Sequence, residues 1–303
     1  MHIPDGFLAT PVWAGLDATA APAVAYLARR AGRNFDEGRI PMLGVMGAFV
    51  FAAQMINFPV GVGISGHLLG GALLAQTLGP SAAAVTMTAI LAIQALVFQD
   101  GGVLALGANV WNMALIGVLA GYLPLGALGC GRRRLAAFLG GALSVLAVAV
   151  VAIAELLVSG VRMPGPVLAV TMGLFFVTAL IEGAITAAVV GAIGAVNPDW
   201  TSRPQAPLAR KAMFGLGACA FLLATGGIFL ASTAPDGLER LAGRIGLGER
   251  ARVLLAAPMP DYEARWFSSA ALGKAAAGMA GLVLIFVLTA LLGKWLIRTR
   301  RKE

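Results

Sequence analysis

Runs of about twenty apolar residues recur along the chain, and they restrict its fold more than any other feature, because a run of that length crosses a hydrocarbon layer as a helix. Only 12% of the residues are charged, whereas a soluble domain carries about 25%. The sequence therefore predicts an all-α, polytopic membrane protein with about nine transmembrane helices. The expected spans are residues 11–28, 41–58, 64–79, 81–98, 106–128, 135–159, 166–196, 211–231 and 272–296.

A polar linker divides these predicted spans into two groups. The sequence NPDWTSRPQAPLARK follows the seventh span and has the proline and polar residues typical of a connection. We expect a seven-helix bundle in the N-terminal part (residues 1–204) and a two-helix module in the C-terminal part (residues 205–303). The C-terminal part would carry a long loop at residues 232–271 outside the membrane.

The basic residues indicate how the chain is oriented. With the N-terminus outside and the C-terminus inside, most lysines and arginines fall in inner connections, as the positive-inside rule requires. The net charge of +8 is thus assigned to membrane topology, and no nucleic-acid partner is predicted. The two cysteines, Cys130 and Cys219, are isolated and lack metal-ligand spacing.

The chain contains two histidines, His2 and His67, and the predicted topology places both at the outer face. His67 lies in a short glycine-rich stretch, GVGISGHLLGG (61–71), that is more typical of a functional element than of a lipid-facing helix. An ionisable group at membrane depth is expensive to bury and is therefore a functional candidate. No HExxH, GxSxG, nucleotide-binding loop or pair of acids at catalytic spacing occurs, so we expect neither an enzyme nor an ATPase.

The position of His2 predicts a particular chelate. The α-amine of Met1 and the imidazole of His2 flank one peptide N–H, and a metal that displaces this proton can bind amine, amide and imidazole nitrogens in one plane. His67 could supply the fourth nitrogen. Planar nitrogen geometry favours Ni(II) or Cu(II) over Zn(II) or Mg(II). Because binding displaces protons, affinity should fall below the usual pKa of an α-amine, about 7.7–8.0.

This chelate requires Met1 to remain the first residue. The opening MHIPDGFLATP lacks the basic and apolar regions of a cleavable signal, and the large side chain of His2 favours retention of Met1. Pro4, Asp5 and Gly6 predict a turn that holds the first residues in a fixed position. An ordinary frayed terminus is the alternative interpretation.

Several segments resemble a known transporter family. MHIPDGFL (1–8), SGHLLGG (65–71) and FQDGGVLALGANVWNMALIG (98–117) are similar to substrate-binding components of cobalt and nickel energy-coupling factor transporters, the CbiM/NikM type. PDGLE (235–239) and APMPDYE (257–263) resemble the small two-span N subunit of the same systems. The chain therefore resembles a fusion of the two components.

The resemblance implies that the chain binds and transports Ni²⁺ or Co²⁺ and needs no organic cofactor. It implies that Met1, His2 and His67 supply the four nitrogens of the metal site. Candidates for groups that orient these ligands by hydrogen bonds are Ser65, Asp100, Asn109 and Asn112. The resemblance also implies a separate T/Q-type transmembrane coupling subunit and cytoplasmic ATPase subunits, all at the bacterial cytoplasmic membrane.

Alternative functions remain open at this point. A membrane metal sensor or storage protein would use the same ligands without moving cargo. A vitamin-binding component of the same transporter group would need an aromatic-lined pocket, which an aromatic content of 7% disfavours. The ligands do not distinguish nickel from cobalt.

Some polar residues allow both a functional and a structural interpretation. Gln54 and Asn57, near His67 in the predicted topology, either support the site or join helices through hydrogen bonds. Loop 232–271 either helps to load the metal or is only structural. Its acids are too dispersed among arginines to predict a metal cage: Asp236, Glu239, Glu249, Asp261 and Glu263.

Overall fold

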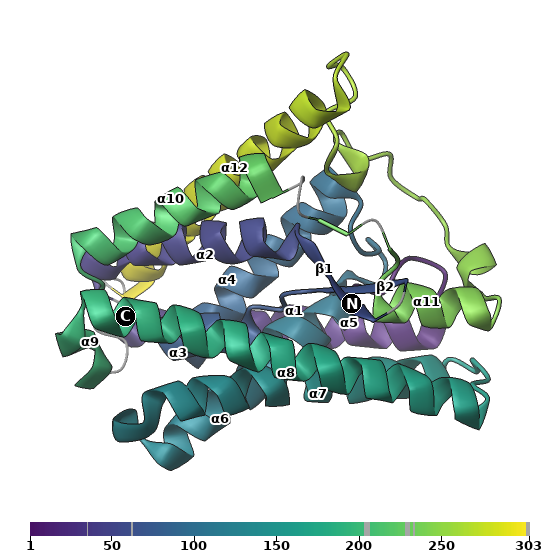
Figure 1. Ribbon diagram of the computed structural model, residues 1–303, viewed down its shortest axis with the longest axis horizontal. Coiled ribbons are helices and arrows are strands. Elements are labelled where there is room, and N and C mark those ends of the chain that lie inside the picture. Colours follow the sequence, from purple (N-terminus) through teal and green to yellow (C-terminus); the bar gives the residue numbers. More distant parts are fainter. Residues whose placement is uncertain (35, 62, 203–206, 228–230, 233, 301–303) are drawn as a thin grey trace.

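Helices make up nearly all the regular structure of this computed structural model, which describes residues 1–34, 36–61, 63–202, 207–227, 231–232 and 234–300 (Figure 1). The α-helices are α1 (Thr10–Asn34), α2 (Ile40–Gln54), α3 (Gly71–Leu78), α4 (Pro80–Ile93), α5 (Leu106–Asn109), α6 (Val118–Leu128), α7 (Arg133–Val158), α8 (Gly165–Val196), α9 (Pro198–Ser202), α10 (Arg210–Gly226), α11 (Gly237–Arg244) and α12 (Ala270–Arg300). Two π-helical segments, Gln94–Phe98 and Val110–Gly117, continue α4 and join α5 to α6. The strands are β1 (Asn57–Gly61) and β2 (Ile64–His67).

The predicted class, an all-α polytopic membrane protein, is confirmed. Within the described residues, five helical stretches are long and apolar enough to cross a membrane: Pro80–Phe98, Leu106–Leu128, Cys130–Val158, Gly165–Val196 and Ala270–Arg298. The expected count of about nine spans is not reached by this criterion. Helices α2 and α10 have 15 and 17 described residues, and α1 is long but contains Asp17 and Pro22.

Residues 64–79 do not form the single helical span predicted for them. Strand β2 pairs antiparallel with β1, with Asn57 opposite His67, and only then does α3 begin. Gly70 separates strand and helix at φ +72°, and a β-carbon there would collide with Val50. All of α3 is buried, and its eight residues span only about 12 Å at 1.5 Å per residue. It is therefore a core helix, and the hairpin in front of it carries His67.

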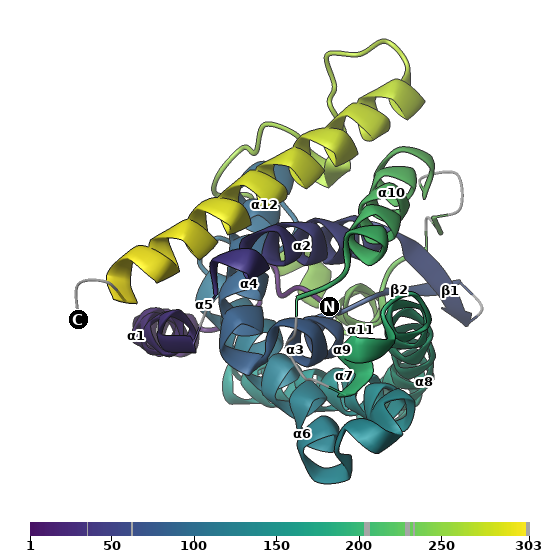
Figure 2. The same cartoon turned by 90° about the vertical axis from the view of Figure 1, so that its left-hand side faces the viewer.

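The C-terminal helices share a core with the N-terminal bundle. Helices α10 and α12 pack against α2 and against each other, while α6, α7 and α8 form the opposite side of the molecule (Figures 1 and 2). Helix α3 lies between these groups, in contact with α2, α4, α6 and α7. The chain beyond α10 then returns to the N-terminus, where the short helix α11 packs on α8 and β2.

Candidate metal-binding site

The first residues of the chain are buried and held in place, so the terminus is not frayed. Ile3 is fully buried in a small apolar cluster with Phe7 and Leu8. Its N–H donates to Asn109 Oδ1 at 2.8 Å, and its carbonyl accepts from Asn109 Nδ2 at 3.1 Å. With these two hydrogen bonds, Asn109 fixes the backbone of Ile3, the residue that follows His2.

The predicted turn at Pro4–Gly6 is present, and Asp5 anchors it. The Asp5 carboxylate is buried and accepts hydrogen bonds from the N–H groups of Val103, Leu104 and Ala105 at 2.8–3.1 Å. The neighbouring Gly102 donates its N–H to the Ile3 carbonyl at 2.9 Å, and a β-carbon on it would collide with Asp5. The glycines after Asp100 are thus explained by the close approach of the N-terminal segment.

His67 presents a neutral nitrogen to the N-terminal amine. Its Nδ1 faces the carbonyl of Leu68 at 3.1 Å and so carries the ring proton. Nε2 then has a free lone pair, which lies 2.5 Å from the Met1 nitrogen. Burial, aided by the nearby N-terminal charge, lowers the pKa of His67 to about 3. The imidazole is therefore available as a ligand without losing a proton.

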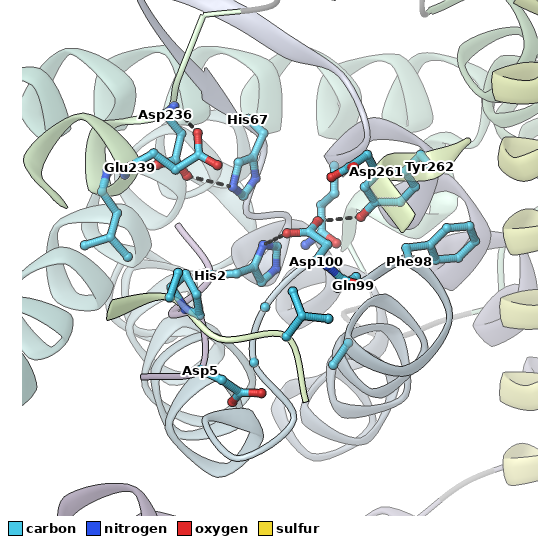
Figure 3. A pocket seen from close by; sticks show the side chains of 18 of the residues that line it. His2, Asp5, His67, Phe98, Gln99, Asp100, Asp236, Glu239, Asp261 and Tyr262 are labelled. Atoms are coloured by element: carbon cyan, nitrogen blue, oxygen red, sulfur yellow. Dashed lines mark hydrogen bonds and ion pairs between the residues drawn. The ribbon is translucent and has the colours of Figure 1, made fainter. Parts of the chain in front are cut away.

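His2 lies beside His67 but turns toward Asp100. The two imidazole rings are parallel within 2°, with centroids 5.3 Å apart (Figure 3). His2 Nδ1 is 2.8 Å from Asp100 Oδ1, while His2 Nε2 is buried without a hydrogen-bond partner. Among the described residues, the amide N–H of His2 also has no acceptor. Two nitrogens of this residue are therefore free to bind another group.

The arrangement suits a metal only if main-chain nitrogens take part. Within the described ranges, no three histidine, cysteine, aspartate or glutamate side chains are grouped to hold a metal ion. The Met1 amine nevertheless lies against the His67 imidazole, and the imidazole of the next residue, His2, stacks beside that of His67 (Figure 3). A fused chelate would use His2 Nδ1, the ring nitrogen nearer the backbone. Metal binding there would therefore require Nδ1 to leave Asp100.

Asp236 is a site residue that the sequence analysis did not predict. Its Oδ2 accepts from the N-terminal ammonium at 2.6 Å and lies 3.8 Å from His67 Nε2. Burial alone would raise the pKa of Asp236, but the N-terminal charge and His67 outweigh it and lower the pKa to about 2. Asp236 is thus a fixed negative charge beside the amine.

A local signal for the position of Asp236 does exist in the sequence. Asp236 is the N-cap of α11, and it forms a capping box with Glu239: the two side chains accept from each other's backbone N–H groups. The pattern Asp-x-x-Glu before a helix predicts such a box. That pattern explains how Asp236 is oriented, but it contains nothing about the N-terminus 235 residues away.

The other candidate orienting groups fall in different places. Ser65 Oγ donates to the carbonyl of Ala234 at 2.7 Å, which joins β2 to the segment that carries Asp236. Asn112 does not reach the terminus: its Nδ2 donates to Glu155 Oε2 at 2.8 Å inside the bundle. The structure therefore brings Asp100 and Asn109 to the first residues and leaves Asn112 in a separate pair.

Two buried side chains hold the peptide that follows His67. Glu182 of α8 is fully buried and accepts from the N–H groups of Leu69 and Gly70 at 2.8 and 2.9 Å. Gln54 of α2 donates to the carbonyl of Leu69 at 2.7 Å. The Leu69 peptide is thus fixed on both sides, which restricts the position of His67 two residues earlier.

We expect Glu182→Gln to destabilise the fold and weaken metal binding together. The glutamine amide turns an N–H₂ group toward one of two backbone N–H donors, and a buried unsatisfied donor costs about 1–3 kcal/mol. Thermal unfolding and nickel titration of the purified chain measure the two effects. Glu155→Gln is the matched control, because its amide oxygen can still accept from Asn112. Equal nickel affinity in both variants would contradict a role for Glu182 in placing His67.

A cavity of about 620 Å³ opens beside these residues (Figure 3). Both parts of the chain line it, and its acidic residues include Asp100, Asp236, Glu239 and Asp261. A water molecule occupies about 30 Å³ in the liquid, so the cavity has room for a cation that keeps its water shell. Arg252 and Lys274 also line it, but the acids outnumber them and leave the lining with the excess negative charge that such an ion favours.

Two family models match the chain. The one described as "cobalt uptake substrate-specific transmembrane region" matches residues 2–200, and the one described as "PDGLE domain" matches residues 210–298. A protein of Archaeoglobus fulgidus, provisionally named a fused nickel transport protein NikMN, is 37% identical over 95% of this chain and 96% of its own length. The fused nickel transport protein NikMN of Rhodobacter capsulatus is 31% identical over 94% of this chain and 95% of its own.

A solved structure has a similar fold. It is the crystal structure of a truncated transition metal transporter, with a TM-score of 0.56 and 32% identity. The similarity covers 66% of this chain and 99% of that one. It thus supports the fold of about two thirds of the present chain.

Proposed function

We propose, from the premise that this chain belongs to the cobalt uptake substrate-specific transmembrane region family, that Met1, His2 and His67 bind Ni²⁺ or Co²⁺ as transported cargo. Membership of this family makes the chain a membrane component of nickel or cobalt transport. The proposed ligands are the Met1 amine, the His2 amide nitrogen, His2 Nδ1 and His67 Nε2. They would lie in one plane around the ion.

One observation supports this site above the others: the buried N-terminal amine lies 2.5 Å from His67 Nε2. Nitrogen–metal bonds of roughly 2.0–2.1 Å, as zinc makes with histidine, put neighbouring ligands of a square plane about 2.9 Å apart. The two nitrogens are thus close to the spacing that an ion between them needs. In this structure the Met1 ammonium contacts His67 Nε2 directly. A metal ion bound between the two nitrogens would therefore have to displace the ammonium proton.

Energy coupling is proposed to come from other proteins. The chain has no nucleotide-binding loop, so a separate transmembrane coupling subunit and cytoplasmic ATPase subunits would drive import. We place the chain in the cytoplasmic membrane with its N-terminus outside and its C-terminus inside, because that orientation leaves most basic residues on the inner side. The metal site and its cavity would then open toward the outer side.

Nickel and cobalt titrations of the purified full-length chain test the proposal. We expect one ion per chain, competition between the two metals, and a visible absorption band typical of planar nickel–nitrogen coordination. A chain that binds neither metal would contradict the proposal. Metal accumulation in cells with and without co-produced ATPase subunits separates a transporter from a sensor or storage protein, because only the transporter needs ATP to accumulate metal.

The pH dependence of binding should reveal how many protons leave. His67 contributes none near neutral pH, because its pKa is held at about 3. The ammonium and the amide each lose one, so nickel affinity should rise roughly hundredfold per pH unit near neutral pH. Titrations at several pH values around neutrality measure this slope. A slope of roughly tenfold or less per pH unit near neutral pH would exclude the deprotonated amide.

A further inference from the structure

We infer that Tyr262, in the C-terminal part, is a positioning residue for metal capture: its hydroxyl holds Asp100 against His2 and so sets the direction of the His2 imidazole. The inference rests on the metal site proposed above. It concerns a residue that makes no contact with the proposed ion itself. The APMPDYE segment (257–263) would thus orient a ligand at the N-terminus of the chain.

A carboxylate bridges the two residues. Tyr262 Oη donates to Asp100 Oδ2 at 2.5 Å, and Asp100 Oδ1 faces His2 Nδ1 at 2.8 Å (Figure 3). Both carboxylate oxygens are therefore engaged, one by each part of the chain. The Asp100 side chain is 29% exposed toward the cavity, so without the tyrosine it would have space to turn away from His2.

The same hydroxyl also connects to the peptide that follows His67. Gln94 Nε2 lies 3.2 Å from Tyr262 Oη and 3.0 Å from Gln54 Oε1. Gln54 in turn donates to the carbonyl of Leu69. Two chains of hydrogen bonds thus meet at Tyr262: one leads to His2, and the other ends at the carbonyl of Leu69, two residues after His67.

The backbone around this contact adopts conformations that L-residues rarely adopt. In the described part of the chain, the non-glycine residues with positive φ are Gln99 (+57°), Asp261 (+55°) and Tyr262 (+56°). Gln99 directly precedes Asp100, and the other two are Tyr262 itself and its neighbour Asp261. Such strain persists only where surrounding structure enforces it, and it concentrates at functional sites. Here the strained residues lie at or next to both partners of the hydrogen bond between Tyr262 and Asp100.

Packing fixes the tyrosine ring independently of its hydroxyl. The ring stacks on the buried Phe98, with centroids 4.7 Å apart and planes inclined by 16°. Nearby, the N–H of Met259 donates to the carbonyl of Val97 at 3.0 Å. A phenylalanine at position 262 would keep the stack and lose only the oxygen, so the hydroxyl can be tested on its own.

The proposed chelate indicates what the Asp100 carboxylate would do when a metal ion is bound. If His2 Nδ1 bound the ion, its proton would move to Nε2, and the nearby Asp100 carboxylate would accept this N–H once the imidazole had turned. A carboxylate bonded to the far nitrogen of a metal-bound histidine fixes its tautomer and raises its basicity. Tyr262 keeps the carboxylate within reach during this exchange.

Nickel titrations of the full-length chain test the inference with Tyr262→Phe, Asp100→Asn and the double variant. We expect each single change to weaken binding about 10–100-fold. The double variant should bind no more weakly than the weaker single variant, because both changes break one chain of contacts. The planar nickel absorption band should shift in the same way in all three. Tyr26→Phe is the matched control, since Tyr26 is 63% exposed.

The outcomes separate this inference from the proposed function. A wild-type chain that does not bind nickel overturns the proposed site itself. A wild-type chain that binds, with Tyr262→Phe equal to Tyr26→Phe, overturns only the role of Tyr262, and so does a double variant whose losses add. Thermal unfolding is followed in parallel. If Tyr262→Phe loses the fold, Gln94→Leu decides instead, because it removes the other partner of the hydroxyl and is expected to give a smaller loss of the same kind.

Discussion

A single glycine added before Met1 is expected to weaken nickel binding by more than about 100-fold, beyond the loss seen when only a supporting residue of a metal site is changed. The extension turns the Met1 amine into an amide and moves the new amine by up to about 3.6 Å. The terminus is buried against His67 and Asp236, so the added residue has no matching place. Titration of the purified chain measures the effect.

The control for this experiment is the same glycine added after residue 303. It changes composition equally and leaves the N-terminus as it was, so we expect wild-type affinity. The extended terminus also loses its ion pair with Asp236, and a moderate fall in the unfolding temperature should accompany the loss of binding. If the N-terminally extended chain binds nickel as tightly as the native chain, the amine is not a ligand.

His67→Ala should produce a loss of similar size by removing the one proposed ligand that is distant in sequence. Met1 and His2 can still offer three nitrogens, but water would take the fourth position. We expect affinity to fall by more than about 100-fold and the absorption band to move to longer wavelength, because water is a weaker ligand than imidazole. Millimolar imidazole should restore part of the binding, since the cavity borders the vacated side chain.

Ser65→Ala is the matched control for this change. Ser65 lies on the same strand, and its hydroxyl bonds to Ala234 in the C-terminal part. Its loss removes a contact between the two parts of the chain but no proposed ligand. A His67→Ala variant that binds nickel as well as Ser65→Ala would remove His67 from the site.

The sequence predicted most helices because lipid imposes a simple rule on them: a spanning segment must be long, apolar and internally hydrogen-bonded. That rule does not apply to segments buried inside the protein. Residues 57–61 and 64–67 contain Pro59 and several glycines, which strands disfavour, yet they pair as two antiparallel strands. Helix α3 is apolar throughout because it lies in the core, and an apolar run alone does not distinguish the core from lipid.

The proposed site follows from the sequence where its chemistry is local. Met1 and His2 are neighbours in the chain, so covalent geometry alone indicates their chelate. Asp236 and Tyr262 reach the site across 235 and 162 residues, and a single sequence does not show such pairings. Asn112 seemed equivalent to Asn109 three residues earlier, but Val110–Gly117 is π-helical. The wider turn directs Asn112 to Glu155.

The burial of Met1 against Asp236 also sets an order for events during protein synthesis. The first residue leaves the ribosome long before the residue that pairs with its amine, so the terminus waits unpaired until some 235 further residues have been made. A terminal formyl group would leave no charge for Asp236 and no lone pair for a metal. If such a group is added, it would have to be removed before the fold closes, because an amine this deeply buried gives an enzyme little access.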